Sequence, residues 1–285
     1  MKTIVAHKRT DITYADYVKR RAETSDFQTL IKEDCIVVDK DNNILFIYTR
    51  LPFDDAEIVG ALDRVDYQND YRSSGLKTTS RIFGSMPRIV MRSDYCRQSS
   101  LALDQPQEHA IVAKYGIKIA GLYHKFSPQT YTQHETLMKE KVLDEYSLKD
   151  TPFTSGIINK NNPLKYHFDS GNFKGVYSAM AVFKRDIEGG YLSMPEYDVG
   201  VELTNNSLFM FDGQSVLHGV TPIKRTSDRA MRYSIVYYSL QQMWNCLPLT
   251  QEVARIRDLK TARERKRWEA LKAKELNGED ALNAH

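Results

Sequence analysis

Residues 166–185 have the sequence YHFDSGNFKGVYSAMAVFKR, in which a His-x-Asp motif precedes an apolar run. Side chains alternate along an extended chain, so His167 and Asp169 project from the same side of it. The run from Val176 to Phe183 is rich in the branched and aromatic residues that favour strands. This stretch therefore predicts a strand that delivers two metal-ligand side chains at its edge.

A second histidine with strand-like neighbours, His218, follows His167 by 51 residues. Two histidines and one carboxylate form a facial triad that leaves positions open on iron(II). Those positions suit a bidentate 2-oxo acid and dioxygen. The set predicts a dioxygenase in which His167, Asp169 and His218 hold iron(II), with 2-oxoglutarate as co-substrate beside O2.

A buried anchor for the far carboxylate of 2-oxoglutarate is expected shortly after His218. Arg232 follows it by fourteen residues, and Ser234 lies two residues further on the same strand face. The arginine fork binds carboxylates through two hydrogen bonds, and the hydroxyl adds a donor. Arg229 competes for this role, but it lies in the loop-like segment SDRAM, so Arg232 is the better candidate.

The predicted elements place a β-rich centre behind helices. Strand-like runs punctuated by Gly, Pro, Asn and Asp suggest a sandwich or barrel: 176–183, 190–193, 207–211, 216–220 and 232–240. A hairpin is expected over 35–38 and 44–49. Helices are expected over 11–33, 56–65, 106–124, from 128 to about 142, and 250–276. Residues 70–100 are expected to be an irregular basic segment, and the polar end of the chain a disordered tail.

Composition narrows the class of protein. The chain has 285 residues, 41% hydrophobic content and a net charge of only +3, so total charge does not indicate a nucleic-acid binder. Three scattered cysteines suggest neither a disulfide framework nor a zinc site. With no apolar segment of membrane-spanning length, we expect a soluble intracellular protein of the cytoplasm, nucleoid or nucleus, with no membrane partner. The oligomeric state is left open.

The chain also resembles a known family. HFDSGNFKGVYSAM, GGYLSMPEYDVGVEL, SLFMFDGQSVLHGVTPI and RYSIVYYS resemble the oxygenase core of the TET/JBP superfamily, which hydroxylates the 5-methyl group of pyrimidines in nucleic acid. TPFTSGIINKN and RIFGSMPRIVMRSDYCRQSSLA resemble segments that precede this core in compact phage and fungal members. The resemblance covers roughly residues 70–240.

The resemblance implies an α+β fold with a double-stranded β-helix (jelly-roll, cupin-like) core, N-terminal supporting helices and a C-terminal helix. It assigns the iron and 2-oxoglutarate to the same residues. The expected divisions are an N-terminal α/β extension with the basic segment (1–105), helices plus the dioxygenase core (106–248), and a charged helix and tail (249–285).

Family membership implies DNA as partner, with 5-methylcytosine or thymine hydroxylated and 5-methylcytosine slightly favoured. A methyl group inside a duplex cannot reach a buried iron, so the base must be flipped out. Candidates for contacting it, by closeness to the ligands in sequence, are Phe168, Asn172, Phe173 and Tyr197. Candidates for the phosphate backbone lie in the basic segment: Arg81, Arg88, Arg92 and Arg97.

Two alternatives remain open at this point. The same iron chemistry can act on a protein side chain or a small metabolite instead of DNA. The chain can also be a non-enzymatic nucleic-acid-binding jelly roll with a degenerate site, although the intact four-residue set argues against it.

Overall fold

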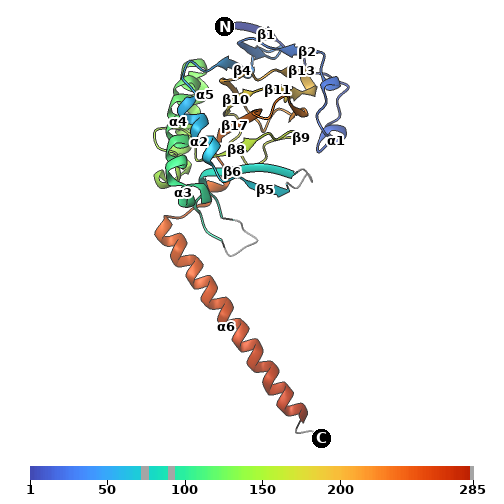
Figure 1. The fold of residues 1–285 in the computed structure, drawn as a ribbon. Coiled ribbons are helices and arrows are strands. Elements are labelled where there is room, and N and C mark those ends of the chain that lie inside the picture. Colours follow the sequence, from blue (N-terminus) through green and yellow to red (C-terminus); the bar gives the residue numbers. More distant parts are fainter. Residues whose placement is uncertain (72–76, 89–93, 283–285) are drawn as a thin grey trace.

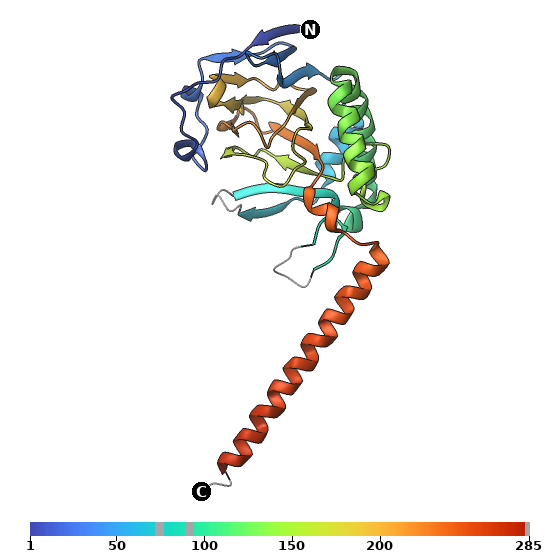
Figure 2. The same ribbon diagram turned by 180° about the vertical axis from the view of Figure 1, so that it is seen from behind.

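Two facing β-sheets form the centre of the molecule, and a layer of helices covers the outer side of one of them (Figure 1). The computed structural model describes residues 1–71, 77–88 and 94–282, without the side chains of 70, 71, 77 and 273–282. A long C-terminal helix projects away from this body in both views (Figures 1 and 2). None of the helices in the described ranges is both long and apolar enough to cross a membrane.

The major sheet has ten strands and recruits the N-terminal part of the chain. Its order is β1-β3-β4-β14-β10-β17-β8-β6-β5, with β7 paired to β6. The bounds along this order are β1 (Lys2–Val5), β3 (Cys35–Val38), β4 (Ile44–Arg50), β14 (Ser207–Phe211), β10 (Ser178–Arg185), β17 (Met231–Tyr238), β8 (Ser155–Lys160), β6 (Lys77–Met86), β5 (Gln68–Tyr71) and β7 (Arg97–Gln98).

The minor sheet faces it and carries two of the predicted iron ligands, in the order β2-β13-β12-β15-β9. Its strands are β2 (Thr29–Ile31), β13 (Val199–Val201), β12 (Leu192–Met194), β15 (His218–Val220) and β9 (Leu164–His167). A separate antiparallel pair consists of β11 (Ile187–Gly189) and β16 (Ile223–Arg225).

Helices α4 and α5 dominate the covering layer, and each begins with a proline in its first turn, where no backbone N–H is needed. The α-helices are α1 (Tyr14–Tyr17), α2 (Ala56–Arg64), α3 (Ser100–Asp104), α4 (Pro106–Phe126), α5 (Pro128–Lys141) and α6 (Leu249–Leu282). Short 3-10 turns are η1 (Thr24–Asp26), η2 (Asp144–Tyr146), η3 (Pro195–Tyr197) and η4 (Gln241–Asn245).

Strand alternation divides the interior into two cores. On β17, Tyr233, Ile235 and Tyr237 pack into the cluster shared with α2 and α4. Val236 points the other way, into the cluster between the two sheets. Because Arg232 and Ser234 share the face of Val236, they also lie between the sheets. This is the α+β jelly-roll arrangement that the family resemblance implied.

Several element predictions are confirmed, among them the hairpin of β3 and β4, the helices α2, α4 and α5, and the strand β14. Residues 11–33 do not form one helix; they form α1, η1 and β2, because Thr29–Ile31 pairs in parallel with β13 at the edge of the minor sheet. The segment 70–100 is not wholly irregular, since β6 pairs with β8 and extends the major sheet. Helix α6 continues beyond the expected end to Leu282, through residues assigned to the tail.

The expectation of no disulfide is wrong. Cys96 and Cys246 are joined in a disulfide across a sequence separation of 150, and Cys35 is the free, buried thiol. Cysteines so far apart give no spacing signal, and only the fold brings the segment before β7 next to the segment before α6. The disulfide therefore fastens the start of the C-terminal helix to the body.

Candidate metal centre and its cavity

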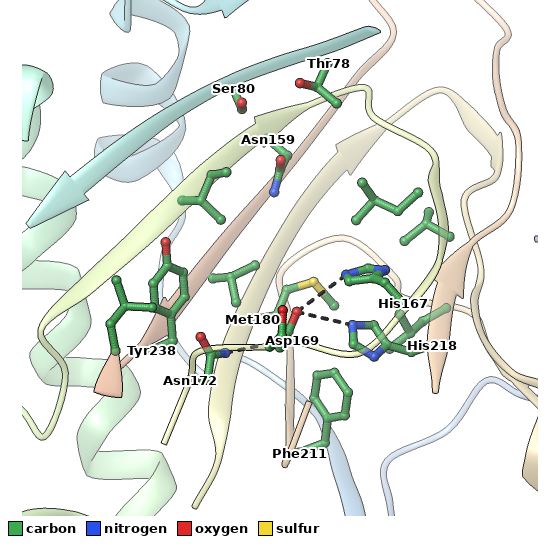
Figure 3. Close-up of a pocket in the computed structure, with 17 residues that line it drawn as sticks. Thr78, Ser80, Asn159, His167, Asp169, Asn172, Met180, Phe211, His218 and Tyr238 are labelled. Atoms are coloured by element: carbon green, nitrogen blue, oxygen red, sulfur yellow. Dashed lines mark hydrogen bonds and ion pairs between the residues drawn. The ribbon is translucent and has the colours of Figure 1, made fainter. Parts of the chain in front are cut away.

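The His-x-Asp motif and the distant histidine meet at one edge of the minor sheet. His167 ends β9 and is the cross-strand neighbour of His218 at the start of β15. Asp169 follows β9 directly, and its Oδ1 lies 3.4 Å from His167 Nε2 and 3.7 Å from His218 Nε2. One ligand atom from each of the three residues lies within 4.8 Å of the others. Figure 3 shows the two imidazoles and the carboxylate pointing toward one another.

Hydrogen bonds set the tautomers of both histidines. Nδ1 of His167 lies 2.8 Å from the carbonyl oxygen of Lys165, and Nδ1 of His218 lies 2.9 Å from that of Val216. A carbonyl only accepts, so each Nδ1 donates and each Nε2 keeps a lone pair for a metal. Burial, and then the neighbouring His167, lower the pKa of His218 to about 4, which keeps its ring neutral. The donor set thus fits a divalent iron ion.

The loop before β15 packs against Asp169 and positions its carboxylate. The backbone N–H of Asp169 donates to the carbonyl oxygen of Gly213 (2.8 Å). A Cβ at residue 213 would lie 2.2 Å from Oδ2 of Asp169, so only glycine leaves room for the carboxylate there. Asn172 Nδ2 also approaches Oδ2 at 3.4 Å and donates to Ser178 Oγ at 3.0 Å.

Arg232 is a buried cation with incomplete hydrogen bonding. Its side chain is 1% exposed, and its Nε and Nη2 have no partner among the described residues. Burial lowers the pKa of Arg232 to about 10. Ser234 is buried on the same face, and its cross-strand neighbour Asn159 lines the cavity beside the triad. An unpartnered guanidinium at this place fits the distal carboxylate of a 2-oxo diacid.

A cavity of about 420 Å³ opens next to the triad (Figure 3). This volume is within the usual range for small-molecule sites. Besides the triad, its polar lining residues are Thr78, Ser80, Asn159, Ser170, Asn172 and Tyr238. Apolar side chains form the remaining wall: Ile157, Leu164, Met180, Leu192, Phe211, Val220, Val236 and Leu240. The cavity can therefore orient a flat polar ligand against the metal.

Of the four residues predicted to touch the base, Asn172 lines this cavity. Phe168 points away, because it alternates with the ligands, and packs edge-on against Tyr14. Phe173 is 2% exposed and belongs to a separate core cluster. Tyr197 borders a different surface hollow. Closeness in sequence to the ligands therefore does not place these three rings at the metal.

The predicted backbone-binding arginines mostly have partners inside the protein. Arg81 is 6% exposed and pairs with Asp104 at 2.6 Å. The other two described arginines also bond internally, Arg88 to the Glu252 carboxylate and the Asn245 carbonyl, and Arg97 to the Asp94 carboxylate. Arg92 lies outside the described residues. These three arginines of the basic segment are therefore bonded to carboxylates within the protein and are not free to contact phosphate.

Sequence reasoning missed several cavity residues. Thr78 and Ser80 belong to β6, in the segment expected to be irregular, and Asn159 is their neighbour on β8. Tyr238 is the last residue of β17, six positions after Arg232. The alternation of side chains along β17 could have predicted that Tyr238 lies between the sheets, because it shares one strand face with Arg232, Ser234 and Val236.

A jelly roll that holds a His-Asp-His set and buries an arginine between its sheets defines the class of iron(II)- and 2-oxoglutarate-dependent oxygenases. The family model of the oxygenase domain of the 2OGFeDO superfamily, Tet_JBP, matches residues 90–241, more than half of the chain. The chain belongs to this family. Its cofactors are therefore iron(II), 2-oxoglutarate and O2, and the triad is able to bind the metal.

Curated relatives match over a shorter stretch. The bifunctional helicase and thymine dioxygenase JBP2 of Trypanosoma brucei brucei is 31% identical over 117 residues, which cover 41% of this chain and 10% of that protein. JBP2 of Leishmania tarentolae is 27% identical, also over 117 residues that cover 41% of this chain and 10% of that protein. The match thus spans about a tenth of the length of these relatives.

A solved structure confirms the fold over most of the chain. NgTET1 in complex with 5mC DNA superimposes with a TM-score of 0.59 at 14% identity, covering 86% of this chain and 84% of that one. At this identity the likeness concerns the fold alone.

Proposed function

We propose that the protein hydroxylates the 5-methyl group of a pyrimidine in DNA, 5-methylcytosine or thymine. The observation that carries the proposal is the cavity of about 420 Å³ whose wall holds the iron triad and further polar side chains. Family membership and the thymine dioxygenase relatives support a nucleobase as its ligand. The two substrates carry their methyl group at the same ring position, so one arrangement can serve both.

In this proposal the base lies in the cavity, and 2-oxoglutarate extends from the triad toward Arg232 and Ser234, which are not among the residues that line the cavity. Arg232 and Ser234 bind the far carboxylate of 2-oxoglutarate, whose other end reaches the metal held by the triad. Iron, when bound, supplies the activation of O2 that the side chains cannot perform. A base enters only after flipping out of the duplex, at a cost of a few kcal/mol. Asn172 and Tyr238 lie on the cavity wall, where they can orient the flipped base.

The test is mass spectrometry of nucleosides after incubating the protein with iron(II), 2-oxoglutarate and ascorbate. One duplex carries 5-methylcytosine with its thymines replaced by uracil, and a matched duplex carries thymine with unmodified cytosine. A hydroxymethyl product from either duplex, absent with His167→Ala, supports the proposal and identifies the base. Succinate formation without oxidation of either base would contradict it and favour a protein or metabolite substrate.

A further inference from the structure

Positive charge is concentrated on the exposed middle of α6, which we define as the arm, residues 257–272. Every residue of the arm is exposed, and both views show it projecting clear of the body (Figures 1 and 2). It contains seven basic and three acidic residues, a net charge of +4. The whole chain carries +3, so the remainder has a net charge of −1.

The cations are not distributed evenly around the arm. Lys260, Arg263 and Arg267 follow one another at spacings of three and four residues, so they share one helix face. Lys266 lies three residues after Arg263 and widens this face. None of the four has an acidic partner among the side chains that the structure describes, whereas Arg265 on another side pairs with Glu269 at 3.6 Å.

The base of α6 is fixed to the body, so the arm has a defined direction. Glu252 is fully buried and pairs with Arg88 of the body. It also accepts hydrogen bonds from the backbone N–H of Leu247 (3.0 Å) and from that of Cys96 in the body (3.4 Å). The disulfide of Cys96 and Cys246 lies beside it in sequence. Burial alone would raise the pKa of Glu252, but these donors hold it below the usual value.

The helix that carries the arm starts close to the proposed active site in sequence. Leu240 lines the cavity, and α6 begins nine residues later at Leu249. The backbone N–H of Gln241 donates to the carbonyl oxygen of Gly171, two residues after the iron ligand Asp169 (2.8 Å). The segment that leads to the arm is therefore bonded to the metal loop.

We infer that the face formed by Lys260, Arg263, Lys266 and Arg267 binds the sugar–phosphate backbone of the DNA whose base enters the cavity. From Lys260 to Arg267 the helix rises about 10 Å, enough to meet about three phosphates of one strand at ~3.4 Å each. A membrane-binding helix needs a continuous apolar face, but Leu259 lies among these cations and Trp268 on another side. This inference rests on the proposed DNA substrate.

The experiment compares two full-length variants with equal charge loss and equal helix propensity. The test variant removes three cations of the face: Lys260→Gln, Arg263→Gln and Arg267→Gln. The matched control removes one lysine and two arginines elsewhere on the arm: Arg257→Gln, Arg265→Gln and Lys272→Gln. Turnover of 2-oxoglutarate without DNA is measured for both and is expected to equal that of the unaltered protein, which shows an intact oxygenase body.

Fluorescence anisotropy with a fluorescent duplex measures Kd over a salt series. Each lost phosphate contact weakens binding about eightfold near 0.1 M salt and lowers the salt slope by about 0.9. Two to three lost contacts should weaken binding by the test variant about 60- to 500-fold and lower its slope by about 2 to 3. The control should stay within about threefold of the unaltered protein. Equal weakening in both variants, or in neither, would overturn the assignment of the face.

Base oxidation in the same duplex separates this inference from the proposed function. If the unaltered protein oxidises the base and the test variant binds DNA normally, the arm inference fails while the function stands. If the unaltered protein neither binds nor oxidises any duplex, the proposed function fails and the inference with it. Vesicles of anionic phospholipid are tested as a third ligand. Binding to these vesicles in place of DNA would overturn the inference in favour of a membrane surface.

Discussion

Replacing Arg232 by methionine should make the ligand-free protein more stable and should weaken binding of 2-oxoglutarate. The guanidinium is buried, and its Nε and Nη2 lack partners among the described residues. Burial alone lowers the pKa of Arg232 to about 10, so the desolvation of its charge is uncompensated and destabilises the folded, ligand-free protein. Methionine is of similar length and apolar, so it removes this cost. We expect the free energy of unfolding to rise by about 1–3 kcal/mol.

The same change should abolish tight binding of 2-oxoglutarate. Two charge-assisted hydrogen bonds are lost, each of about 1.5–3 kcal/mol, so KM for the co-substrate should rise at least about 100-fold. The matched control is Arg229→Met, the exposed competitor three residues earlier, which should change neither quantity. Urea unfolding of the metal-free protein and initial rates across 2-oxoglutarate concentrations measure the two effects.

Either of two results would refute this reasoning. A marked loss of stability in the Arg232→Met protein would mean that the guanidinium already has a stabilising partner in the free chain. An unchanged KM for 2-oxoglutarate would mean that the carboxylate binds elsewhere. A shift of both quantities in Arg229→Met instead would move the anchor to the loop before β17.

Three further predictions follow from single contacts. Gly213→Ala should push the Asp169 carboxylate aside, because the new Cβ would lie 2.2 Å from Oδ2. We expect the iron affinity, measured by competition with a chelator, to fall at least about tenfold. An unchanged iron affinity would contradict the contact. Burial lowers the pKa of His134 to about 3, so the unfolded chain binds an extra proton at this residue as pH falls below about 6.5. This residue alone should lower the stability by about 2 kcal/mol between pH 7 and pH 5, and urea titrations of His134→Phe should show a pH dependence smaller by this amount. Reduction of the Cys96–Cys246 disulfide, which closes a loop of about 150 residues, should lower the unfolding free energy by up to about 5 kcal/mol; equal midpoints with and without reductant would show that the bond is not formed in solution.

The sequence predicted the metal centre well because its signal is local. His167 and Asp169 need only one strand edge, and the period of two places them together whatever the rest of the chain does. Arg232 and Ser234 follow from the same alternation on a second strand. His218 required the two strands to be neighbours, and the cross-strand pairing of His218 with His167 supplies this.

The rest of the site depends on contacts between distant segments, which spacing does not encode. Thr78 lines the cavity because β6 joins the major sheet next to β8, although its surroundings in sequence are basic and polar. Arg81 is taken out of the predicted DNA surface by Asp104, a partner that only the fold identifies. Phe173 illustrates the opposite error, since an aromatic residue near a ligand is more often core than contact.

The strands that carry the iron ligands are held by residues that precede the family match, which begins at residue 90. Glu196 is fully buried and accepts a hydrogen bond from the backbone N–H of Leu217, next to His218, at 2.9 Å. Two side chains of the N-terminal segment also reach the Glu196 carboxylate: Lys8 at 3.0 Å and Tyr14 at 2.8 Å.

On the other strand, the hydroxyl of Tyr166, next to His167, donates to Asp26 at 2.8 Å, and Arg20 pairs with the same carboxylate at 2.6 Å. Backbone bonds join this strand to the same segment, from Lys19 N–H to the Tyr166 carbonyl and from Tyr166 N–H to the Arg20 carbonyl. Both buried carboxylates therefore connect a ligand strand to the first 26 residues. Removing the cation of either group leaves a carboxylate of low exposure without a charge partner, which destabilises the folded protein. The N-terminal segment therefore helps to position both strands that carry the iron ligands, in addition to the jelly roll that defines the family.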